Sequence, residues 1–313
     1  MIRKQVQARK IEATLVDQTT GPRLTIFAIP KPFKGIVSTI QENAIASWAS
    51  LQPHAEIFLF GDENDQELQR VAREYGATVL PVRVNEFGTP LVNDAIQQVK
   101  TIASGQVLCY TNGDMVFGPE LLQVTSDLHD HEIIDWVGIG QRIELDVNEP
   151  VPMDSSTAVN EFFDRARRDG RVSSIVCKEY FVFPIHLFDA VPDFAVGRGN
   201  WDNWMVSHAK SGNVPIVDLT PVLPAIHQNH DYSHVPGGRK SAYYAGEEAR
   251  ENQRLAGGRN LISGSTANWQ MTKSGLKRLK FPMLRMVGDA PRFVSLLRNL
   301  LFLGYIMPGF PFS

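Results

Sequence analysis

The sequence predicts an α/β fold in which a mostly parallel central sheet is covered by helices on both faces. Short β-rich segments, beginning with "RLTIFAI" (23–29) and "EIFLF" (56–60), alternate with segments whose apolar residues recur at helical spacing. The segment "VLCY" (107–110) is apolar throughout, which is typical of a strand buried in a parallel sheet. This alternation at short spacing indicates consecutive β-α-β units in one continuous domain.

The elements of the first half follow in the order β-α-β-α-β-α-β. In chain order they are strand 23–29, helix 36–51, strand 56–60, helix 68–75, strand 77–82, helix 92–102 and strand 107–110. The second half is less regular. Its expected elements are strands at 136–139, 180–183 and 214–219, and a helix over 160–168.

The composition is that of an ordinary globular protein, with 313 residues of which 43% are hydrophobic and 21% charged. Because the net charge is −3 and no zinc-finger or RNA-binding pattern is present, we expect no nucleic-acid partner. We expect a loose polar leader over 1–21, one α/β domain over 22–265 and a basic and apolar tail over 266–313. The two cysteines make no disulfide framework and the leader has no signal-peptide core, so we expect a cytoplasmic protein.

The tail combines basic residues with the apolar end "LLFLGYIMPGFPF". Its uninterrupted apolar stretch is shorter than the roughly 20 residues that span a bilayer. A basic amphipathic segment can lie on an anionic membrane surface, which would place the protein at the inner face of a membrane. Packing of the tail on the domain, or dimerisation through it, explains the same pattern.

The apolar strand 107–110 is followed directly by Asn112, Gly113 and Asp114. Ligands of parallel sheets collect at the carboxyl ends of the strands, and an aspartate there is poorly explained by core packing. Its carboxylate is well placed to hold a magnesium or manganese ion against a phosphate group. Asn112 would orient a ribose hydroxyl or a water bound to the metal. The alternative is an ordinary Asn-Gly turn.

Two other segments are candidates for nucleotide contacts. Asp62 follows the second strand and can accept a hydrogen bond from a base or a ribose, although "GDENDQEL" is also rich in helix-capping residues. Gly88 and Thr89 precede a helix, where backbone amides can approach a nucleotide. With Pro90 in the first turn, the same residues also read as a plain helix start.

The segment "GRGNWDNWMV" (197–206) places Asp202 between Trp201 and Trp204. Aromatic faces cover the C–H face of a sugar, and the neighbouring carboxylate can take a proton from a hydroxyl group. We therefore predict that Asp202 is a general base and that the two tryptophans bind a carbohydrate acceptor. The alternative is a helix-capping aspartate beside two core tryptophans.

The segment "HQNHDYSH" supplies His227, His230, Asp231 and His234. On a helix these residues would share one face, as in a zinc site, but the flanking prolines make a loop an equally good interpretation. The sharper hypothesis is that His227 completes the coordination of the metal held by Asp114. Candidate phosphate-binding arginines are Arg142, Arg198 and Arg239.

Together these residues resemble GT-A fold nucleotide-sugar glycosyltransferases over about 24–234. The features that carry the resemblance are the β-α-β run, "YTNGDMVF" at the place of the acid-x-acid metal motif, the "EYFVFP" strand, "WDNWM" and the later histidine. The resemblance implies that Asp114 and His227 hold the metal together with Asn112, which stands at the place of the first acid of the motif and also touches the nucleotide sugar. It also implies nucleotide contact by Asp62 and catalysis by Asp202. We further expect Glu179, at the start of "EYFVFP", to contact the acceptor.

We therefore predict a glycosyltransferase of the hexosyl or N-acetylhexosaminyl type, dependent on Mn²⁺ or Mg²⁺. It would move sugar from a nucleotide-diphosphate donor to a glycan or glycolipid, with inversion, in polysaccharide biosynthesis. A nucleotidyltransferase would need a glycine-rich loop after the first strand, where "PKPFKG" (30–35) has a single glycine. Two alternatives remain, a metallohydrolase built on the histidine cluster and a non-catalytic carbohydrate-binding protein.

Overall fold

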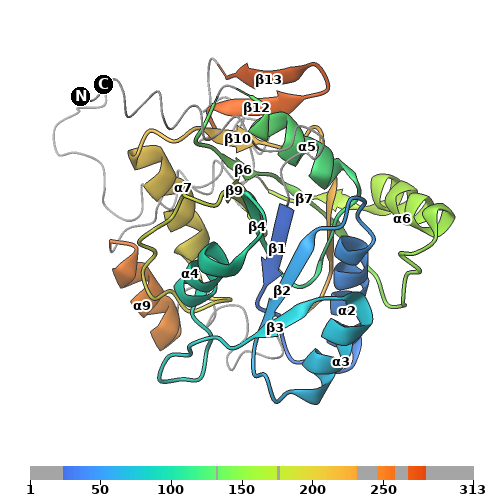
Figure 1. Ribbon diagram of the computed structural model, residues 1–313, viewed down its shortest axis with the longest axis horizontal. Helices are drawn as coiled ribbons and strands as arrows, with labels where there is room; N and C mark the ends of the chain where they lie inside the picture. The colour runs from blue at the N-terminus through green and yellow to red at the C-terminus, as the bar shows by residue number, and fades with distance from the viewer. Residues whose placement is uncertain (1–23, 132, 175–176, 231–244, 258–266, 280–313) are drawn as a thin grey trace, which may run out of the picture.

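The computed structural model describes residues 24–131, 133–174, 177–230, 245–257 and 267–279, and its centre is a nine-stranded sheet (Figure 1). In spatial order its strands are β13 (Gly275–Arg278), β12 (Trp269–Thr272), β10 (Ile216–Asp218), β6 (Val137–Ile139), β9 (Tyr180–Pro184), β4 (Val107–Thr111), β1 (Leu24–Ala28), β2 (Glu56–Phe60) and β3 (Thr78–Leu80). Neighbouring strands are parallel, except that β9 runs antiparallel to β4 and β6, and β13 to β12. The predicted mostly parallel sheet is confirmed.

A second, smaller sheet crosses the carboxyl end of β4. Its order is β5 (Met115–Val116), β11 (Ala225–Gln228), β7 (Arg142–Leu145) and β8 (Arg171–Val172). In the register of this sheet, His227 lies opposite Met115 on one side and Glu144 on the other. The small sheet therefore brings residues that are more than a hundred positions apart to the end of β4.

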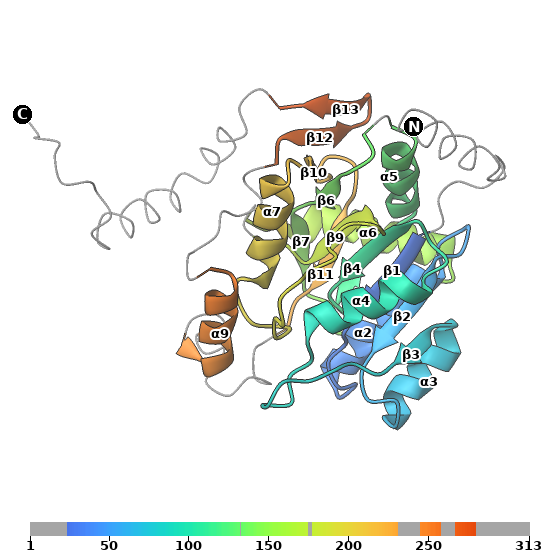
Figure 2. The same cartoon turned by 60° about the vertical axis from the view of Figure 1, so that its left-hand side comes forward.

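Helices cover both faces of the central sheet, as the sequence predicts (Figures 1 and 2). One apolar cluster packs α2 (Ile36–Ala49), α3 (Gln66–Tyr75), α5 (Glu120–His129) and α6 (Ser156–Asp169). The other cluster, on the opposite face, packs α4 (Val92–Ile102) and α7 (Trp201–Ser211), with α9 (Glu247–Leu255) beside them. Alternate residues of β4 enter the two clusters, which explains why positions 107–110 are apolar without alternation.

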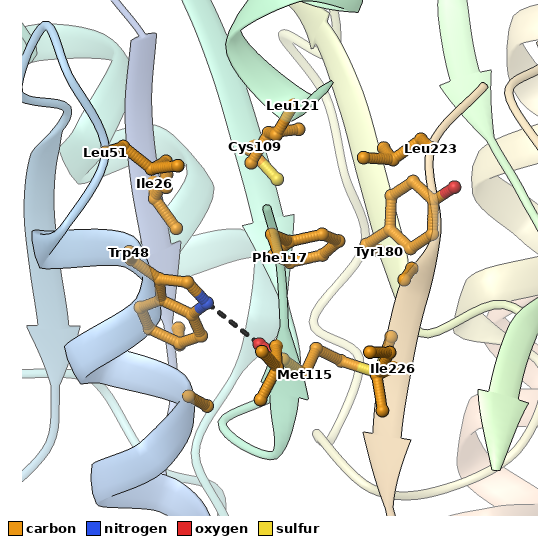
Figure 3. Close-up of a cluster of buried hydrophobic side chains, with 14 of the residues drawn as sticks. Ile26, Trp48, Leu51, Cys109, Met115, Phe117, Leu121, Tyr180, Leu223 and Ile226 are labelled. Carbon is orange, nitrogen blue, oxygen red and sulfur yellow. Dashed lines mark hydrogen bonds between the residues drawn. The ribbon is translucent and has the colours of Figure 1, made fainter. Parts of the chain in front are cut away.

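The segment that follows Asp114 is anchored in the core. The indole Nε1 of Trp48, on α2, donates a hydrogen bond of 2.8 Å to the carbonyl oxygen of Met115 (Figure 3). Trp48 is fully buried, so this bond satisfies both a buried donor and a buried acceptor. Losing the indole would leave the carbonyl of Met115 unpaired beside Asp114, so the turn that carries the carboxylate depends on packing against α2.

The domain boundary differs from the sequence prediction. Strands β12 and β13 lie within the expected tail, yet β12 pairs with β10 and extends the central sheet. The mixed polar, basic and apolar side chains of "WQMTKSGLKR" (269–278) give no strong strand pattern. The expected leader (1–21) and residues 280–313 lie outside the described residues. Within the described part of the chain, no helix has both the length and the apolar character needed to cross a membrane.

Candidate functional site

Asp114 lies in the turn between β4 and β5, at the carboxyl end of the central sheet. Its side chain is 7% exposed, and its Oδ2 lies 2.9 Å from His230 Nε2 and 3.9 Å from His227 Nε2. Its other oxygen, Oδ1, is buried and makes no hydrogen bond. A buried carboxylate oxygen without a partner is costly, unless a ligand that is not part of the chain satisfies it.

Asp114, His227 and His230 form what we call the Asp–His cluster. One ligand atom from each residue lies within 4.8 Å of the other two, which is close enough for a single metal ion to contact all three. The Nδ1 of His227 is buried and unpaired as well. A carboxylate and two imidazoles are a donor set that suits divalent transition metals. The residues present therefore fit the divalent ion expected from the sequence.

The charge state of the cluster favours metal binding at neutral pH. Burial, assisted by the nearby charge of Arg142 and opposed by the attraction of Asp114, lowers the pKa of His227 to about 4, so the imidazole is neutral at pH 7. Burial alone would raise the pKa of Asp114. The charge of His227 in acid, the hydrogen bond with His230 and the charge of Lys31 hold this pKa well below its usual range. The centre thus presents an ionised carboxylate beside a neutral imidazole.

Lys31, in the loop after β1, is the cation nearest to this carboxylate among the described residues. Its Nζ lies 3.8 Å from Asp114 Oδ2 and 2.9 Å from His230 Nε2. The backbone of Lys31 is held on both sides by Gln41, whose Oε1 accepts from the Lys31 N–H at 2.7 Å and whose Nε2 donates to the Lys31 carbonyl at 2.8 Å. Gln41 is 2% exposed, so this clamp is part of the core.

The glycine of the Asn-Gly-Asp turn is required by close packing on this clamp. A Cβ at Gly113 would lie 2.9 Å from Gln41 Oε1 and 3.5 Å from the Cα of Pro30. Any larger residue would push Gln41 off the loop that carries Lys31. The turn is therefore shaped by contact with the β1 loop, as well as by the turn preference of Asn-Gly.

Asn112, Glu179 and Arg142 form a polar group next to the Asp–His cluster. The Asn112 N–H donates to the Glu179 carbonyl at 3.0 Å, and the Asn112 amide donates to the Glu179 carboxylate. Glu179 is also paired with Arg142, which lies 3.2 Å from Glu144. The Asn112 amide is thus directed at Glu179. Asn112, Arg142 and Glu179 therefore meet in one group, although the sequence assigned them separately to the metal, the donor and the acceptor.

Asp202 is connected to this polar group by Lys178, which contacts Asp202 and precedes Glu179 in the chain. The Asp202 carboxylate is at the second position of α7, with 23% of its side chain exposed, and its Oδ2 is 3.6 Å from Lys178 Nζ. Lys178 is 1% exposed at its side chain and also donates to Asn203 Oδ1 at 2.9 Å. Because Lys178 immediately precedes Glu179, the base candidate and the donor-side group belong to the same edge of the sheet.

The two tryptophans that flank Asp202 have different environments. Trp201 is 6% exposed and packs edge-on against Tyr110 at 5.0 Å between ring centres, so the expectation that it binds an acceptor directly is wrong: its ring faces the core. Trp204 is partly exposed and stacks on His208 at 4.4 Å. Residues three apart are neighbours on one face of a helix, and both rings pack on the same apolar cluster, Trp201 inside it and Trp204 partly buried against it.

The predicted nucleotide contacts lie on two exposed loops. Asp62 follows β2, and its Oδ1 accepts hydrogen bonds from the backbone and side chain of Asn64 at 2.9 and 3.1 Å. The Gly88-Thr89 turn is tied to Arg198, whose guanidinium lies 3.4 Å from Thr89 Oγ1. The structure does not bring either loop into contact with Asp114.

Two cavities lie outside the Asp–His cluster. One, of about 950 Å³, is formed by α5, the 220–224 segment and the β12–β13 hairpin. The other, of about 750 Å³, lies between the 83–87 loop and α9. The second cavity adjoins the Gly88-Thr89 turn, since Asn85 and Glu248 line it. Neither contains a residue of the cluster, so the chemistry of the donor groups, rather than cavity size, defines the candidate site.

Sequence reasoning assigned His230 only to a separate zinc cluster, and it gave no role to Lys31 or Lys178. The signal for His230 and Lys31 was positional, because both follow strands that end near the carboxyl end of β4. Pairing of β11 with β5 could not be read from periodicity, and it is this pairing that joins His230 to Asp114. Asp231, His234 and Arg239 lie outside the described residues.

No family model matches the chain, and neither does any curated protein. Similar solved structures include Staphylococcus aureus TarS in complex with UDP-GlcNAc, at 20% identity and a TM-score of 0.31. The match covers 39% of this chain and only 35% of that TarS structure.

Two further matches are enzymes crystallised with a metal. Glucosyl-3-phosphoglycerate synthase from Mycobacterium tuberculosis, with Mg²⁺ and UDP, shares 15% identity over 84% of this chain and 88% of that chain, at a TM-score of 0.44. The mannosyltransferase PcManGT from Pyrobaculum calidifontis, with GDP-Man and Mn²⁺, shares 12% identity over 67% and 58%, at 0.42. Because these identities are below 25% and the TM-scores below 0.5, they assign no activity to this chain.

Proposed function

We propose that this protein is a metal-dependent glycosyltransferase with a GT-A type fold, which uses a nucleotide-diphosphate sugar. The observation that carries the proposal is the Asp–His cluster at the carboxyl end of β4, in which Asp114 Oδ1 is buried without a partner and one donor atom from each of the three residues can meet a single ion. A cation is attractive there, and a diphosphate is the anion that such a cation would hold at the edge of a parallel sheet.

Asp114, His227 and His230 would hold the ion. When bound, the ion supplies positive charge that stabilises the negative charge growing on the departing diphosphate. Two imidazoles favour Mn²⁺ over Mg²⁺, because Mg²⁺ strongly prefers oxygen ligands. Asn112, whose amide donates to Glu179, would act by orienting Glu179 and the sugar rather than as a metal ligand.

Asp202 would take the proton of the acceptor hydroxyl as that oxygen attacks the anomeric carbon. Its carboxylate is partly exposed, so a hydroxyl can reach it, and Lys178 fixes its position from the buried side. As the new bond forms, the bond from the anomeric carbon to the diphosphate oxygen breaks, and the diphosphate leaves with the electron pair. Attack from the face opposite the leaving group inverts the anomeric centre.

Arg142 and the loops that carry Asp62 and Gly88-Thr89 would bind the donor. Arg142 is 12% exposed at its side chain, and its Nε is buried without a partner, which leaves a guanidinium N–H for an anion or a hydroxyl of the donor. On the acceptor side, Trp204 offers a partly exposed ring and Glu179 a carboxylate for sugar hydroxyls. Trp201 would shape the acceptor site only through its packing.

The acceptor is proposed to be a glycan or glycolipid, and the cell compartment the cytoplasm. The compartment is proposed from the sequence, whose two cysteines make no disulfide framework. Contact of the C-terminal segment with a membrane surface is kept as part of the proposal. The donor sugar is left at the level of a hexose or N-acetylhexosamine.

A thermal-shift experiment tests the donor class. Nucleoside diphosphates would be added to purified protein with and without Mn²⁺, because a ligand of the native state raises the melting temperature. We expect a rise with one diphosphate that requires Mn²⁺ in the wild type and in the control Asp130→Asn, an exposed residue that follows α5. The rise should disappear in Asp114→Asn. A rise that is equal in Asp114→Asn would contradict the proposal.

One observation favours a second candidate, a metallohydrolase. A carboxylate with two imidazoles also suits Zn²⁺, which activates water in hydrolytic enzymes. Stabilisation by Zn²⁺ alone, with no response to any nucleoside diphosphate, would move the assignment to this class. A non-catalytic carbohydrate-binding protein would instead bind the sugar nucleotide without transfer or hydrolysis.

A further inference from the structure

The ammonium of Lys31 lies beside two ligand atoms of the Asp–His cluster. Its Nζ is 2.9 Å from His230 Nε2 and 3.8 Å from Asp114 Oδ2, and these two ligand atoms are themselves 2.9 Å apart. An ammonium group is therefore in contact with the same atoms that a metal ion would use. No sequence motif assigned a role to this residue.

The ammonium and a metal ion compete for the same electron pairs. The Nε2 atom of a neutral imidazole has one site, which either carries a proton or offers a lone pair. If His230 Nε2 coordinates a metal, it can no longer hydrogen-bond with Lys31 Nζ or with Asp114 Oδ2 in the present arrangement. Two cations would also repel each other across a few ångströms in a poorly hydrated site. Metal binding must displace the Lys31 ammonium.

The displaced ammonium has only a limited range of destinations. The Lys31 N–H and carbonyl are clamped by Gln41 at 2.7 and 2.8 Å, and Gly113 packs directly on this clamp. The backbone is thus fixed, while the Lys31 side chain remains 31% exposed and can rotate. Its ammonium must stay within one side-chain length of the metal, on the solvent side, where a metal-bound anion would lie.

We propose that Lys31 neutralises Asp114 in the metal-free protein and transfers its ammonium to the donor diphosphate once the divalent cation is bound. This inference rests on the proposed function, and it assigns Lys31 as a diphosphate-binding residue and Gln41 as the positioning residue that fixes it. The ammonium of Lys31 then faces a negative group in both states, the Asp114 carboxylate without metal and the donor diphosphate with metal. Without nucleotide the ammonium opposes the metal, and with nucleotide it supports the complex.

Binding measurements on Lys31→Met test this exchange without relying on turnover. Mn²⁺ affinity, without nucleotide, would be measured by electron paramagnetic resonance of free Mn²⁺. The affinity of a nucleoside diphosphate at saturating Mn²⁺ would be measured by calorimetry. We expect Lys31→Met to bind Mn²⁺ about tenfold more tightly, because a competing cation is removed, and the diphosphate at least about tenfold more weakly, because a charge-assisted bond is lost.

Lys34→Met is the matched control, since Lys34 is an exposed lysine in the same loop. It should leave both affinities within about twofold of the wild type, which is the range of surface substitutions. Lys31→Arg should restore part of the diphosphate affinity, because it keeps the charge.

The opposite signs separate this role from a structural one. If Lys31 only supports the loop, Lys31→Met weakens both ligands or neither, and the inference is wrong. If the wild type binds Mn²⁺ but no nucleoside diphosphate, the proposed function is wrong instead, whatever Lys31→Met does to the metal. If Lys31→Met binds Mn²⁺ more tightly but binds the diphosphate as the wild type does, Lys31 competes with the metal but does not bind the diphosphate, and the proposed transfer of the ammonium is wrong.

Discussion

Two segments place candidate functional residues at the end of a strand or the start of a helix. One is the turn that carries Asp114, after β4. The other is the segment that carries Trp201 and Trp204, at the start of α7. In the first, the polar side chain is buried, and one carboxylate oxygen has no partner. In the second, the aromatic ring of Trp201 is buried against Tyr110, while the polar Asp202 remains partly exposed beside Lys178. Residue type alone suggested a ligand-binding role for both segments.

The difference lies in what surrounds each side chain. An aromatic ring gains stability by burial, so a tryptophan at the start of a helix enters the core whenever space allows. Burial of a carboxylate destabilises the folded protein. The Asp114 side chain is only 7% exposed, so it requires compensating groups such as Lys31 and His230. Buried charge is therefore the stronger indication of a binding site, and the predictions below compare the two segments.

The largest effect is expected at Asp202. Asp202→Asn removes the proposed base while keeping the shape of the side chain, and we expect transfer to slow by about 10²- to 10⁴-fold. Donor binding should change little, because Asp202 belongs to the acceptor side. Single-turnover assays at saturating donor would measure the rate, with the exposed Asp164→Asn as control. A rate within threefold of the wild type would show that another group accepts the proton.

Next come the two tryptophans. Trp201→Ala should lower the free energy of unfolding by about 3–5 kcal/mol, as for other buried aromatic residues. Trp204→Ala should cost only about 1–2 kcal/mol, because the ring is partly exposed and mainly stacks on His208. Urea denaturation of both variants gives the comparison. Equal costs would mean that Trp201 is not the core residue of the pair.

The pH dependence of stability reports on the Asp–His cluster. The pKa of His227 is lowered by burial from 6.5 to about 4, so between these pH values the unfolded chain binds a proton that the folded chain does not. The contribution of His227 to the free energy of unfolding is therefore fully present above pH 6.5. It decreases as the pH falls, by about 3 kcal/mol down to pH 4.

Urea denaturation at several pH values, in the presence of a chelator, checks this behaviour. His227→Gln should lose stability less steeply between pH 7 and 4 than the wild type, because glutamine does not titrate. Parallel curves for the two proteins would contradict the assignment of a buried, neutral His227.

The smallest effect is expected at Asp62. Its carboxylate is exposed and already accepts hydrogen bonds from Asn64. Asp62→Asn should weaken nucleoside-diphosphate binding by about threefold, the loss of one solvent-exposed hydrogen bond. Calorimetry measures this, with the neighbouring Glu63→Gln as control. Equal affinity of Asp62→Asn and the wild type would remove Asp62 from the donor site.

Much of the fold follows from local patterns. The apolar strands and the helical periodicity around Trp48 and Val92 predict a parallel sheet with helices on both faces, and the structure has this arrangement. Strands β12 and β13 could not be predicted, because their side chains are mixed and their stability comes from pairing with β10.

The candidate site could be predicted only in part. Asp114 and His227 follow from position after a strand and from the histidine-rich segment. The contacts of His230 and Lys31 depend on the antiparallel pairing of β5 with β11 and on the Gln41 clamp, which join segments far apart in the chain. The ion pair of Glu179 with Arg142 also depends on contacts between distant segments, because the pairing of β9 with β4 positions Glu179.

The central claim is that Asp114, His227 and His230 together hold a divalent ion. Pulsed electron paramagnetic resonance of Mn²⁺-loaded protein measures it most directly, because nitrogen nuclei of bound imidazoles modulate the echo of the manganese spin. We expect nitrogen modulation in the wild type that is lost in the double variant His227→Gln, His230→Gln, with no Mn²⁺ bound by Asp114→Asn. Nitrogen modulation that survives in the double variant, or tight Mn²⁺ binding by Asp114→Asn, would contradict the account.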